Sequence, residues 1–184
     1  MLKIVKIIKT KWQERKLKKE LNKHLIALDD AYDELISNRA LSLWYHWTPE
    51  KYELLYDRII NHDLDKFISE RNFEAYRAYL YPINNAEKEA YCKRFENVVE
   101  MHKKQNRHHW EARVNDNPDT FTETQEIDCL EEVLDLMARM KEKSLDYFLG
   151  FKNNMGIPPV QKDFIERILF NIYKDGEKEN ENNA

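Results

Sequence analysis

Two short segments of the sequence contain the residue types that bind metal ions and move protons. The first is His62-Asp63, which is followed one helical turn later by Lys66. Imidazole and carboxylate together suit manganese, iron, zinc or magnesium, and adjacent side chains can reach one ion where a helix ends or kinks. A lysine at this distance could neutralise a phosphate or protonate a leaving oxygen. We therefore predict a metal site at His62 and Asp63, with Lys66 as a catalytic group.

The second segment places His102, His108 and His109 within eight residues. On an unbroken helix His102 and His109 share a face but stand about 10 Å apart along the axis. The ions of a two-metal site are only about 4 Å apart, so either the helix breaks near Gln105-Asn106 or one histidine binds substrate. We predict His102 and His109 as ligands. His108 points about 100° away from His109 on a helix, and we assign it to substrate binding with Asn106 and Arg107.

A later predicted helix carries acids that could complete the metal site. Asp128, Glu131 and Asp135 are the candidates, and Asp135 follows Glu131 by one turn. The apolar side of this helix contains Leu130, Val133, Leu134 and Met137, and Asp135 falls outside it, where solvated acids usually lie. Periodicity alone therefore predicts a surface position for Asp135.

Helical periodicity predicts the elements that must position these residues. Between residues 16 and 36 an apolar stripe recurs at steps of three and four and includes His24. A second helix opens at Thr48-Pro49-Glu50 and ends near Ile60, which delivers the chain to His62. Further helices are predicted over residues 69–81, where Pro82 stops the helix, and over 86–102, 123–149 and 160–173.

Composition favours a single all-α domain. The chain has 184 residues with only three glycines and five prolines, fewer than a fold rich in tight turns needs. We divide it into a basic N-terminal helix or arm (residues 1–15), a helical domain (16–174) and a disordered polar tail (175–184). Trp44, Trp47 and Trp110 are expected in the core.

The first 20 residues are strongly basic, with eight lysines or arginines against two acids, although the whole chain has a net charge of -4. With Ile8 and Trp12 on an apolar side, this helix could touch a membrane surface or a nucleic acid. The alternative is an ordinary docked surface helix, which we favour because nothing else in the chain extends the basic patch. The sequence carries no strong nucleic-acid signal, and it leaves the oligomeric state open.

Cysteine use and hydropathy indicate a cytoplasmic protein. Cys92 and Cys129 have no motif spacing, so they predict neither a disulfide framework nor a thiolate zinc site. No apolar run approaches the roughly 20 residues of a membrane span, and the N-terminus lacks the pattern of a signal peptide.

The order His24, His62-Asp63, Asp135 resembles that of the HD-domain metal-dependent phosphohydrolases, and HDLDKF (62–67) is similar to their HDxxK form. The run of H-x3-L, HDLDKF, EAYRAYLYP, H-x3-N-x-HHW and E-x3-D more closely resembles an HD-like family of bacterial and phage proteins without an assigned function. The resemblance covers most of residues 16–173. It implies a helical HD-like domain in which His24, His62, Asp63 and a late acid bind one or two divalent ions. Asp135 is the preferred late acid, with Asp128 and Glu131 left open.

A metal in this setting implies hydrolysis of a phosphate ester or anhydride, with a nucleotide or a related compound as substrate. The sequence does not distinguish manganese, iron, zinc, magnesium, nickel and cobalt. Two alternatives remain: a non-catalytic helical metal-binding or interaction protein, of a kind that a phage could encode, and a di-iron protein that activates oxygen.

Overall fold

The computed structural model describes residues 2–37, 47–139, 150 and 155–181, and every regular element in these ranges is a helix. In chain order the elements are α1 (Leu2–Ser37), α3 (Pro49–Ile60), α4 (Asp65–Ile68), α5 (Glu70–Leu80), α6 (Asn85–Gln105), the 3-10 helix η1 (Trp110–Ala112), α7 (Glu123–Arg139) and α9 (Pro159–Glu181). The prediction of an all-α chain is confirmed. Among these helices, none is long and apolar enough to cross a bilayer.

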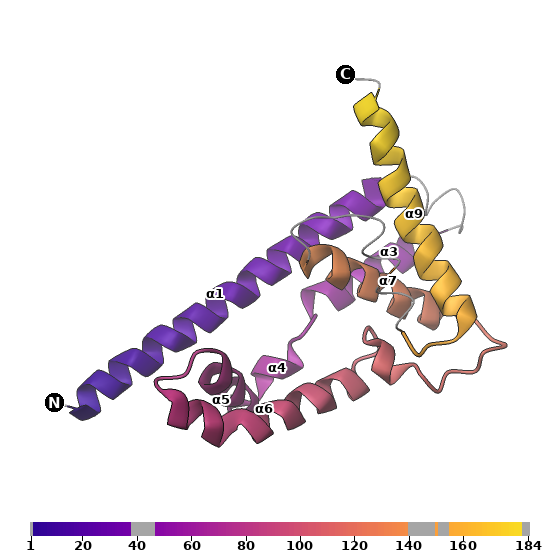
Figure 1. Cartoon of the computed structure of the whole chain (residues 1–184). Coiled ribbons are helices and arrows are strands. Elements are labelled where there is room, and N and C mark those ends of the chain that lie inside the picture. Colours follow the sequence, from indigo (N-terminus) through magenta and orange to yellow (C-terminus); the bar gives the residue numbers. More distant parts are fainter. Residues whose placement is uncertain (1, 38–46, 140–149, 151–154, 182–184) are drawn as a thin grey trace.

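Helix α7 lies at the centre of the fold and contacts α1, α3 and α9 (Figure 1). Its side chains from Ile127 through Met137 are all buried. The core around it includes Leu28 of α1, Leu55 of α3 and Leu169 of α9. Because α7 is enclosed on every side, each polar residue that it carries must find a partner inside the protein.

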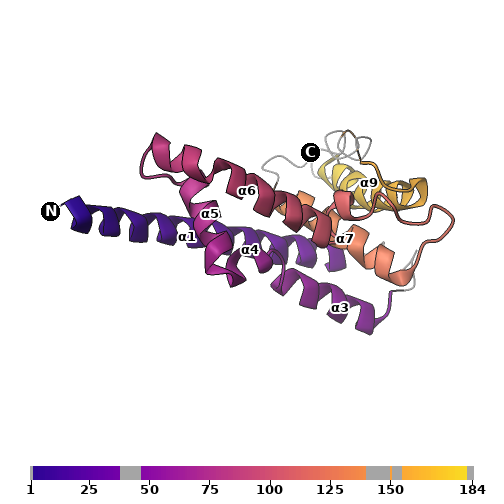
Figure 2. The same cartoon turned by 90° about the horizontal axis from the view of Figure 1, so that it is seen from below.

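Helices α5 and α6 pack against each other, and α5 also contacts α1. The two views place α5 beside the N-terminal half of α1, while α3, α7 and α9 gather toward its C-terminal half (Figure 2). The His62-Asp63 turn and α4 connect the two groups of helices.

Side-chain caps fix where the central helices begin. At the start of α7 the backbone N–H of Gln125 donates to Oγ1 of Thr122 (3.3 Å), and the N–H of Thr122 donates to Oε1 of Gln125 (2.7 Å). This reciprocal pair is a capping box. At the start of α6, Oδ1 of Asn84 accepts from the N–H of Glu87 at 3.0 Å. These caps set the rotational register of the helices that carry the candidate ligands.

Several element ends follow the sequence pattern and others extend beyond it. Helix α3 begins at Pro49 after the N-cap Thr48, and α5 ends before Tyr81 and Pro82, as predicted. Helix α1 runs continuously across residues 15 and 16, where the sequence suggested a boundary, and α9 continues to Glu181 beyond the predicted end at Tyr173. Residues 140–149 of the predicted 123–149 helix lie outside the described residues, as does Trp44.

Candidate metal centre

His62 and Asp63 lie in a tight turn between α3 and α4. The backbone N–H of His62 donates to the carbonyl of Ile59 (3.1 Å), and that of Lys66 donates to the carbonyl of Asp63 (3.0 Å). Asp63 has a φ of 60°, the only positive value at a non-glycine residue within the described ranges. Aspartate tolerates this left-handed conformation better than most residues. The turn buries both residues, so that only 5% of the surface of His62 and 7% of that of Asp63 are exposed.

A helix break brings the later histidines together. Helix α6 ends at Gln105, and Asn106 leaves it in an extended conformation (φ -96°, ψ 115°). The chain then turns, and the N–H of His109 donates to the carbonyl of Asn106 at 3.0 Å. As a result, Nε2 of His109 lies 2.8 Å from Nε2 of His102. Of the two arrangements that the sequence left open, the broken helix is the one observed.

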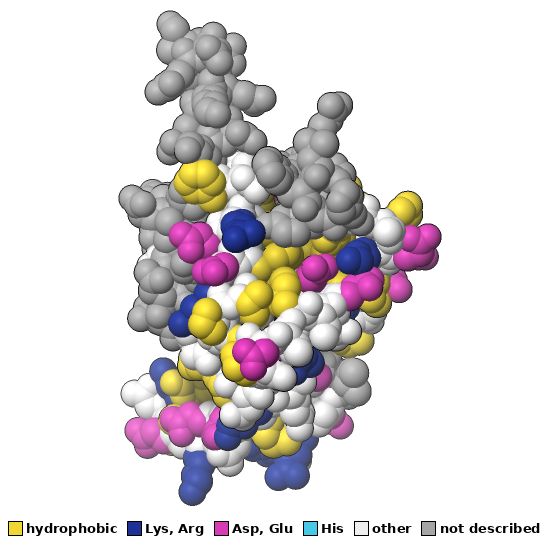
Figure 3. All heavy atoms as spheres, turned by 90° about the vertical axis from the view of Figure 1, so that its right-hand side faces the viewer, with side chains coloured by type: hydrophobic (Ala, Val, Ile, Leu, Met, Phe, Trp, Pro, Cys, Tyr) yellow, Lys and Arg dark blue, Asp and Glu magenta, His cyan; other side chains and the backbone are white. Residues whose placement is uncertain are grey.

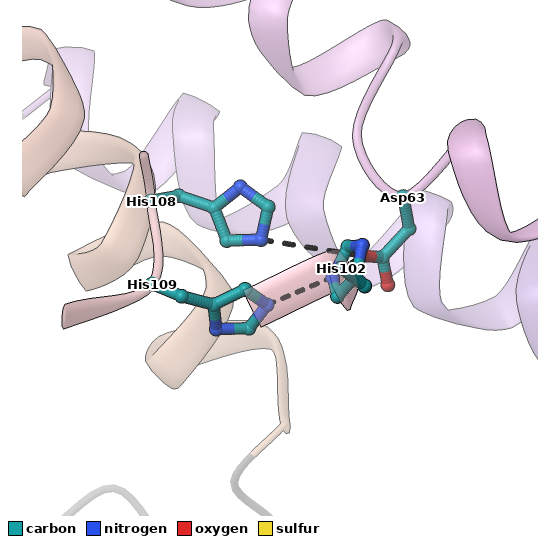
Figure 4. A group of neighbouring side chains, drawn as sticks. All are labelled: Asp63, His102, His108 and His109. Carbon is teal, nitrogen blue, oxygen red and sulfur yellow. Dashed lines mark hydrogen bonds and ion pairs between the residues drawn. The ribbon is translucent and has the colours of Figure 1, made fainter. Parts of the chain in front are cut away.

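Asp63, His102, His108 and His109 form what we call the Asp63 group. Each residue offers one donor atom, and these atoms lie within 4.8 Å of one another. Oδ1 of Asp63 lies 3.0 Å from Nε2 of His102 and 4.0 Å from Nε2 of His108. Figure 4 shows His108 and His109 pointing from the segment after α6 toward His102 and Asp63.

His24, His62 and Asp135 form a second cluster, the His24 group, which joins α1, the 61–64 turn and α7. Oδ1 of Asp135 lies 3.1 Å from Nε2 of His24 and 3.5 Å from Nε2 of His62. Nε2 of His62 is also 3.7 Å from Oδ1 of Asp63, so His62 links the two groups. Among the described residues, no histidine reaches the face of the molecule shown in Figure 3.

The expectation that Asp135 lies on the surface is wrong, because the residue is buried, with 5% of its surface exposed. Periodicity failed because the acids of α7 are satisfied by basic side chains instead of water: Asp128 pairs with Arg58 and Arg107, Glu132 with Arg113, and Asp135 with Arg139 and His24. The two arginines of Asp128 occupy both of its oxygens. Of the three candidate late acids, Asp135 is the one beside His24.

Glu131, the third candidate acid, contacts the Nδ1 atoms of two histidines, whose Nε2 atoms face the clusters. Its Oε1 lies 3.1 Å from Nδ1 of His62 and 3.1 Å from Nδ1 of His108. A carboxylate on Nδ1 fixes the imidazole tautomer that leaves Nε2 as a lone-pair donor. We therefore interpret Glu131 as a positioning residue, although its own oxygen is close enough to share an ion with these two imidazoles.

Asp65 orients His102 in a similar way, with Oδ2 lying 2.9 Å from Nδ1 of His102. The amide of Asn106 donates to the same Oδ2 (3.1 Å) and to the backbone carbonyl of His102 (2.9 Å). Sequence reasoning missed Asp65, whose only signal was a second acid within HDLDKF. It assigned Asn106 to substrate, whereas the observed contacts of Asn106 hold Asp65 and His102.

The remaining predicted residues are also engaged with acids. Nζ of Lys66 lies 2.5 Å from Oδ2 of Asp63, so it neutralises the carboxylate on the side away from His102. Arg107, predicted to bind substrate, donates to Asp128 (2.7 Å) and Asp116 (2.8 Å). His108, which helical geometry assigned to substrate binding, lies in the Asp63 group.

The electrostatics of the carboxylates keep them ionised. Burial alone would raise the pKa of Asp63, but contacts with His102 and Lys66 outweigh it and hold the pKa well below its usual value. Burial likewise opposes ionisation of Glu131, yet hydrogen bonds from His108 and His62 lower its pKa to about 2. Each carboxylate is therefore charged at neutral pH.

The histidines differ from one another in charge. Burial disfavours protonated His62, but Asp135 and Glu131 raise its pKa to about 9. Burial lowers the pKa of His109 to about 2 and also lowers the pKa of His108. His108 and His109 are therefore neutral near pH 7 and can donate a lone pair to a cation without first losing a proton.

Four buried lone-pair atoms in these clusters, Nε2 of His24, His62 and His108 and Oδ1 of Asp63, make no hydrogen bond of good geometry among the described residues. Their polar neighbours are the other members of the clusters, at ion-pair distances of 3.0–4.0 Å. Leaving a buried polar atom unpaired costs about 1–3 kcal/mol. Two ligands with bonds of about 2.1 Å to one ion can be at most about 4.2 Å apart, and the separations of 3.0–4.0 Å around Asp63 satisfy this limit. The residues therefore fit a divalent metal ion.

Comparison with protein families finds a match over residues 10–171 to a family model described as a family of unknown function (DUF5662). Neither the search of curated proteins nor that of solved structures gave a match.

Proposed function

This chain belongs to the family of unknown function DUF5662, and we propose that it is a metal-dependent phosphohydrolase whose substrate is a nucleotide or a related phosphate ester. The observation that carries the proposal is the convergence of buried imidazole nitrogens and carboxylate oxygens, from α1, α6, α7 and two connecting segments, in two adjoining groups. The order of these ligand residues along the chain is also the feature in which the sequence resembles the HD-domain phosphohydrolases. This resemblance supports hydrolysis as the reaction.

The ligand assignment follows the two clusters. His24, His62 and Asp135 would hold one ion, and Asp63 with His102, His108 and His109 would hold a second or complete the shell of the first. Imidazole and carboxylate donors suit manganese, iron, zinc, nickel or cobalt, and magnesium favours sites with more oxygen. An ion bound there would supply Lewis acidity, which activates water near neutral pH and polarises a phosphoryl oxygen.

Two cations of the chain lie against the ligand carboxylates and could hold the phosphate. Nζ of Lys66 contacts Asp63, and Nε of Arg139 donates to Oδ1 of Asp135 at 2.7 Å. The Arg139 side chain is about half exposed (48%). When an ion takes the charge of these carboxylates, both cations become available to the negative oxygens of a phosphate. We also assign Lys66 as the group that would donate a proton to the leaving oxygen.

Metal analysis combined with a phosphate-release screen tests the proposal. Purified protein is stripped with a chelator and reloaded with each ion in turn, and phosphate release is then measured over nucleoside mono-, di- and triphosphates. His62→Ala and Asp63→Ala should lose both the metal and the activity. Asp57→Ala, which removes an exposed acid of α3, is the matched control and should keep both.

Other outcomes would assign the site differently. Metal that binds stoichiometrically without any phosphate release would overturn the hydrolase and leave a metal-binding or interaction protein. The five clustered imidazoles also suit ferrous iron, so dioxygen consumption by the iron-loaded form without hydrolysis would favour an oxygen-activating protein instead.

A further inference from the structure

Helix α1 exposes three large apolar side chains near its N-terminal end. Ile8 and Trp12 are each 62% exposed, and the neighbouring Ile7 is 50% exposed. Ile8 and Trp12 are four residues apart and therefore lie on one face of the helix. Large apolar side chains that are exposed side by side on one helix face are typical of a surface that meets a partner.

The opposite face of α1 is fastened to the body, so the exposed face cannot turn inward. Gln13 and Leu17 are buried, and Oε1 of Gln13 accepts a hydrogen bond from Arg77 of α5 at 3.2 Å. Arg77 is itself held by Glu87 of α6 at 2.8 Å. Beyond this attachment the N-terminal end of α1 projects past α5 and α6 in both views of the fold (Figures 1 and 2).

Basic side chains surround the exposed apolar pair. Lys9, Lys11, Arg15, Lys16 and Lys19 are all exposed. The first 20 residues hold eight of the 30 basic residues and two of the 34 acidic residues of the chain, so this end is positive while the rest is negative. Nζ of Lys16 also lies over the rings of Trp12 (5.6 Å) and Tyr81 (4.7 Å), which places a cation beside the indole.

We propose that the projecting end of α1, centred on Ile8 and Trp12, docks on an anionic lipid bilayer. Isoleucine and tryptophan enter the boundary between headgroups and acyl chains, while the lysines and Arg15 contact acidic headgroups. The helix lies on the membrane surface and does not cross it. This inference stands independently of the proposed hydrolysis.

Two other occupants fit the surface less well. Pairing with the same face of a second copy would bring two sets of lysines together, which like charges oppose. A nucleic-acid backbone would satisfy the cations but offers the exposed isoleucines nothing apolar to contact. A bilayer satisfies both kinds of side chain, and it meets only the projecting basic end while the acidic body stays away from the negative surface.

The docking face and the His24 group share one helix. Trp12 and His24 both belong to α1, so they are separated along its axis by about 18 Å.

Cosedimentation of the full chain with vesicles tests this inference. Binding is expected to mixed phosphatidylcholine–phosphatidylglycerol vesicles, to be absent with phosphatidylcholine alone, and to weaken as salt is added. Ile8→Ser with Trp12→Ser, and separately Lys11→Glu with Lys19→Glu, should each reduce binding to the mixed vesicles at least tenfold. The matched controls Leu54→Ser on α3 and Lys104→Glu on α6 change exposed residues elsewhere and should bind as the wild type does.

Tryptophan fluorescence gives a second readout. The wild-type emission should shift to shorter wavelength on mixed vesicles, and Trp12→Phe should bind but lose that shift. Circular dichroism confirms that each variant keeps its helices. The inference is overturned if the wild type does not bind the mixed vesicles, or if the Ile8→Ser/Trp12→Ser variant binds them as well as the wild type does. Binding of this face to duplex nucleic acid, or dimerisation through it, in place of vesicle binding would also overturn the inference.

Discussion

The carboxylate of Glu131 lies 3.1 Å from Nδ1 of His62, on the side of the ring opposite the nitrogen that faces Asp63 and Asp135. This contact orients the His62 ring through a side chain of α7, whose residues from Ile127 to Met137 are all buried. The same oxygen lies 3.1 Å from Nδ1 of His108. One carboxylate oxygen of Glu131 therefore contacts and orients two imidazoles.

Replacement of Glu131 by glutamine should weaken metal binding while the fold is kept. A neutral amide holds Nδ1–H less strongly and can impose the wrong tautomer, and loss of such a partner typically costs 10- to 100-fold in affinity. Competition with a chromophoric chelator measures the affinity of each form. Glu126→Gln, which alters a partly buried acid on the same helix that pairs with Lys51, is the control and should match the wild type. An unchanged affinity for Glu131→Gln would show that the contact does not position the ligands.

Stability of the metal-free protein should fall as pH rises above neutrality. The pKa of His62 is about 9 in the folded protein and about 6.5 in an unfolded chain, so protonation favours the fold. This contribution is complete below pH 6.5 and is lost as pH rises through 9. His102 shifts in the same direction. Urea unfolding across this window should show a loss of about 3 kcal/mol from His62.

Two further measurements separate this effect from a general loss of stability. His62→Gln should reduce the pH dependence between pH 6.5 and 9 and leave the part that His102 contributes. In protein loaded with a divalent ion the trend should reverse, because the ion and the proton compete for the same nitrogen. A wild type whose free energy of unfolding stays level across this window would contradict the assignment of a protonated His62.

The sequence predicted the helices well because most of them are amphipathic. In α1, Leu17, Leu28, Ala31 and Leu35 of the predicted stripe are all buried, and the helix break at Asn106 was one of two arrangements that the spacing of His102 and His109 required. Local rules were sufficient for these features, since a stripe or a breaker is visible within a few residues.

The interior of α7 could not be predicted in the same way. Periodicity assumes that one side of a helix meets water, whereas Asp135 and Glu132 are buried against Arg139 and Arg113. These partners differ in kind: Arg139 is local, while Arg113 comes from the segment after η1. The role of Asp65 depended likewise on how α4 approaches α6, which no local pattern contains.

The buried ion pair of Arg113 and Glu132 should be important for stability. Arg113 is fully buried, and it also donates to Sγ of Cys129 (2.9 Å) and Oε1 of Gln161 (3.2 Å). Arg113→Ala leaves Glu132 charged and unpaired in the core, which typically costs about 3–5 kcal/mol. Denaturant unfolding measures the change, and Arg71→Ala at an exposed position of α5 should cost under about 0.5 kcal/mol. Equal effects of the two substitutions would disprove this role for the pair.

Lys66 should affect metal binding and turnover in opposite directions. Nζ of Lys66 contacts Oδ2 of Asp63 at 2.5 Å and so competes with a cation for that carboxylate. Lys66→Met keeps the length of the side chain but removes the charge, so we expect metal affinity to be equal or higher. If Lys66 holds the phosphate or protonates the leaving oxygen, kcat should nevertheless fall about 10²- to 10³-fold.

Comparison with two further variants separates charge from proton transfer at Lys66. Lys66→Arg keeps a cation but is a poor proton donor, so it should restore substrate binding, seen in KM, more than it restores kcat. Lys103→Met, on α6 and paired with Glu111, is the matched control and should leave both constants unchanged. A Lys66→Met protein that binds metal and retains full kcat would show that Lys66 takes no part in the reaction. The charge of Lys66 would then serve only to pair with Asp63.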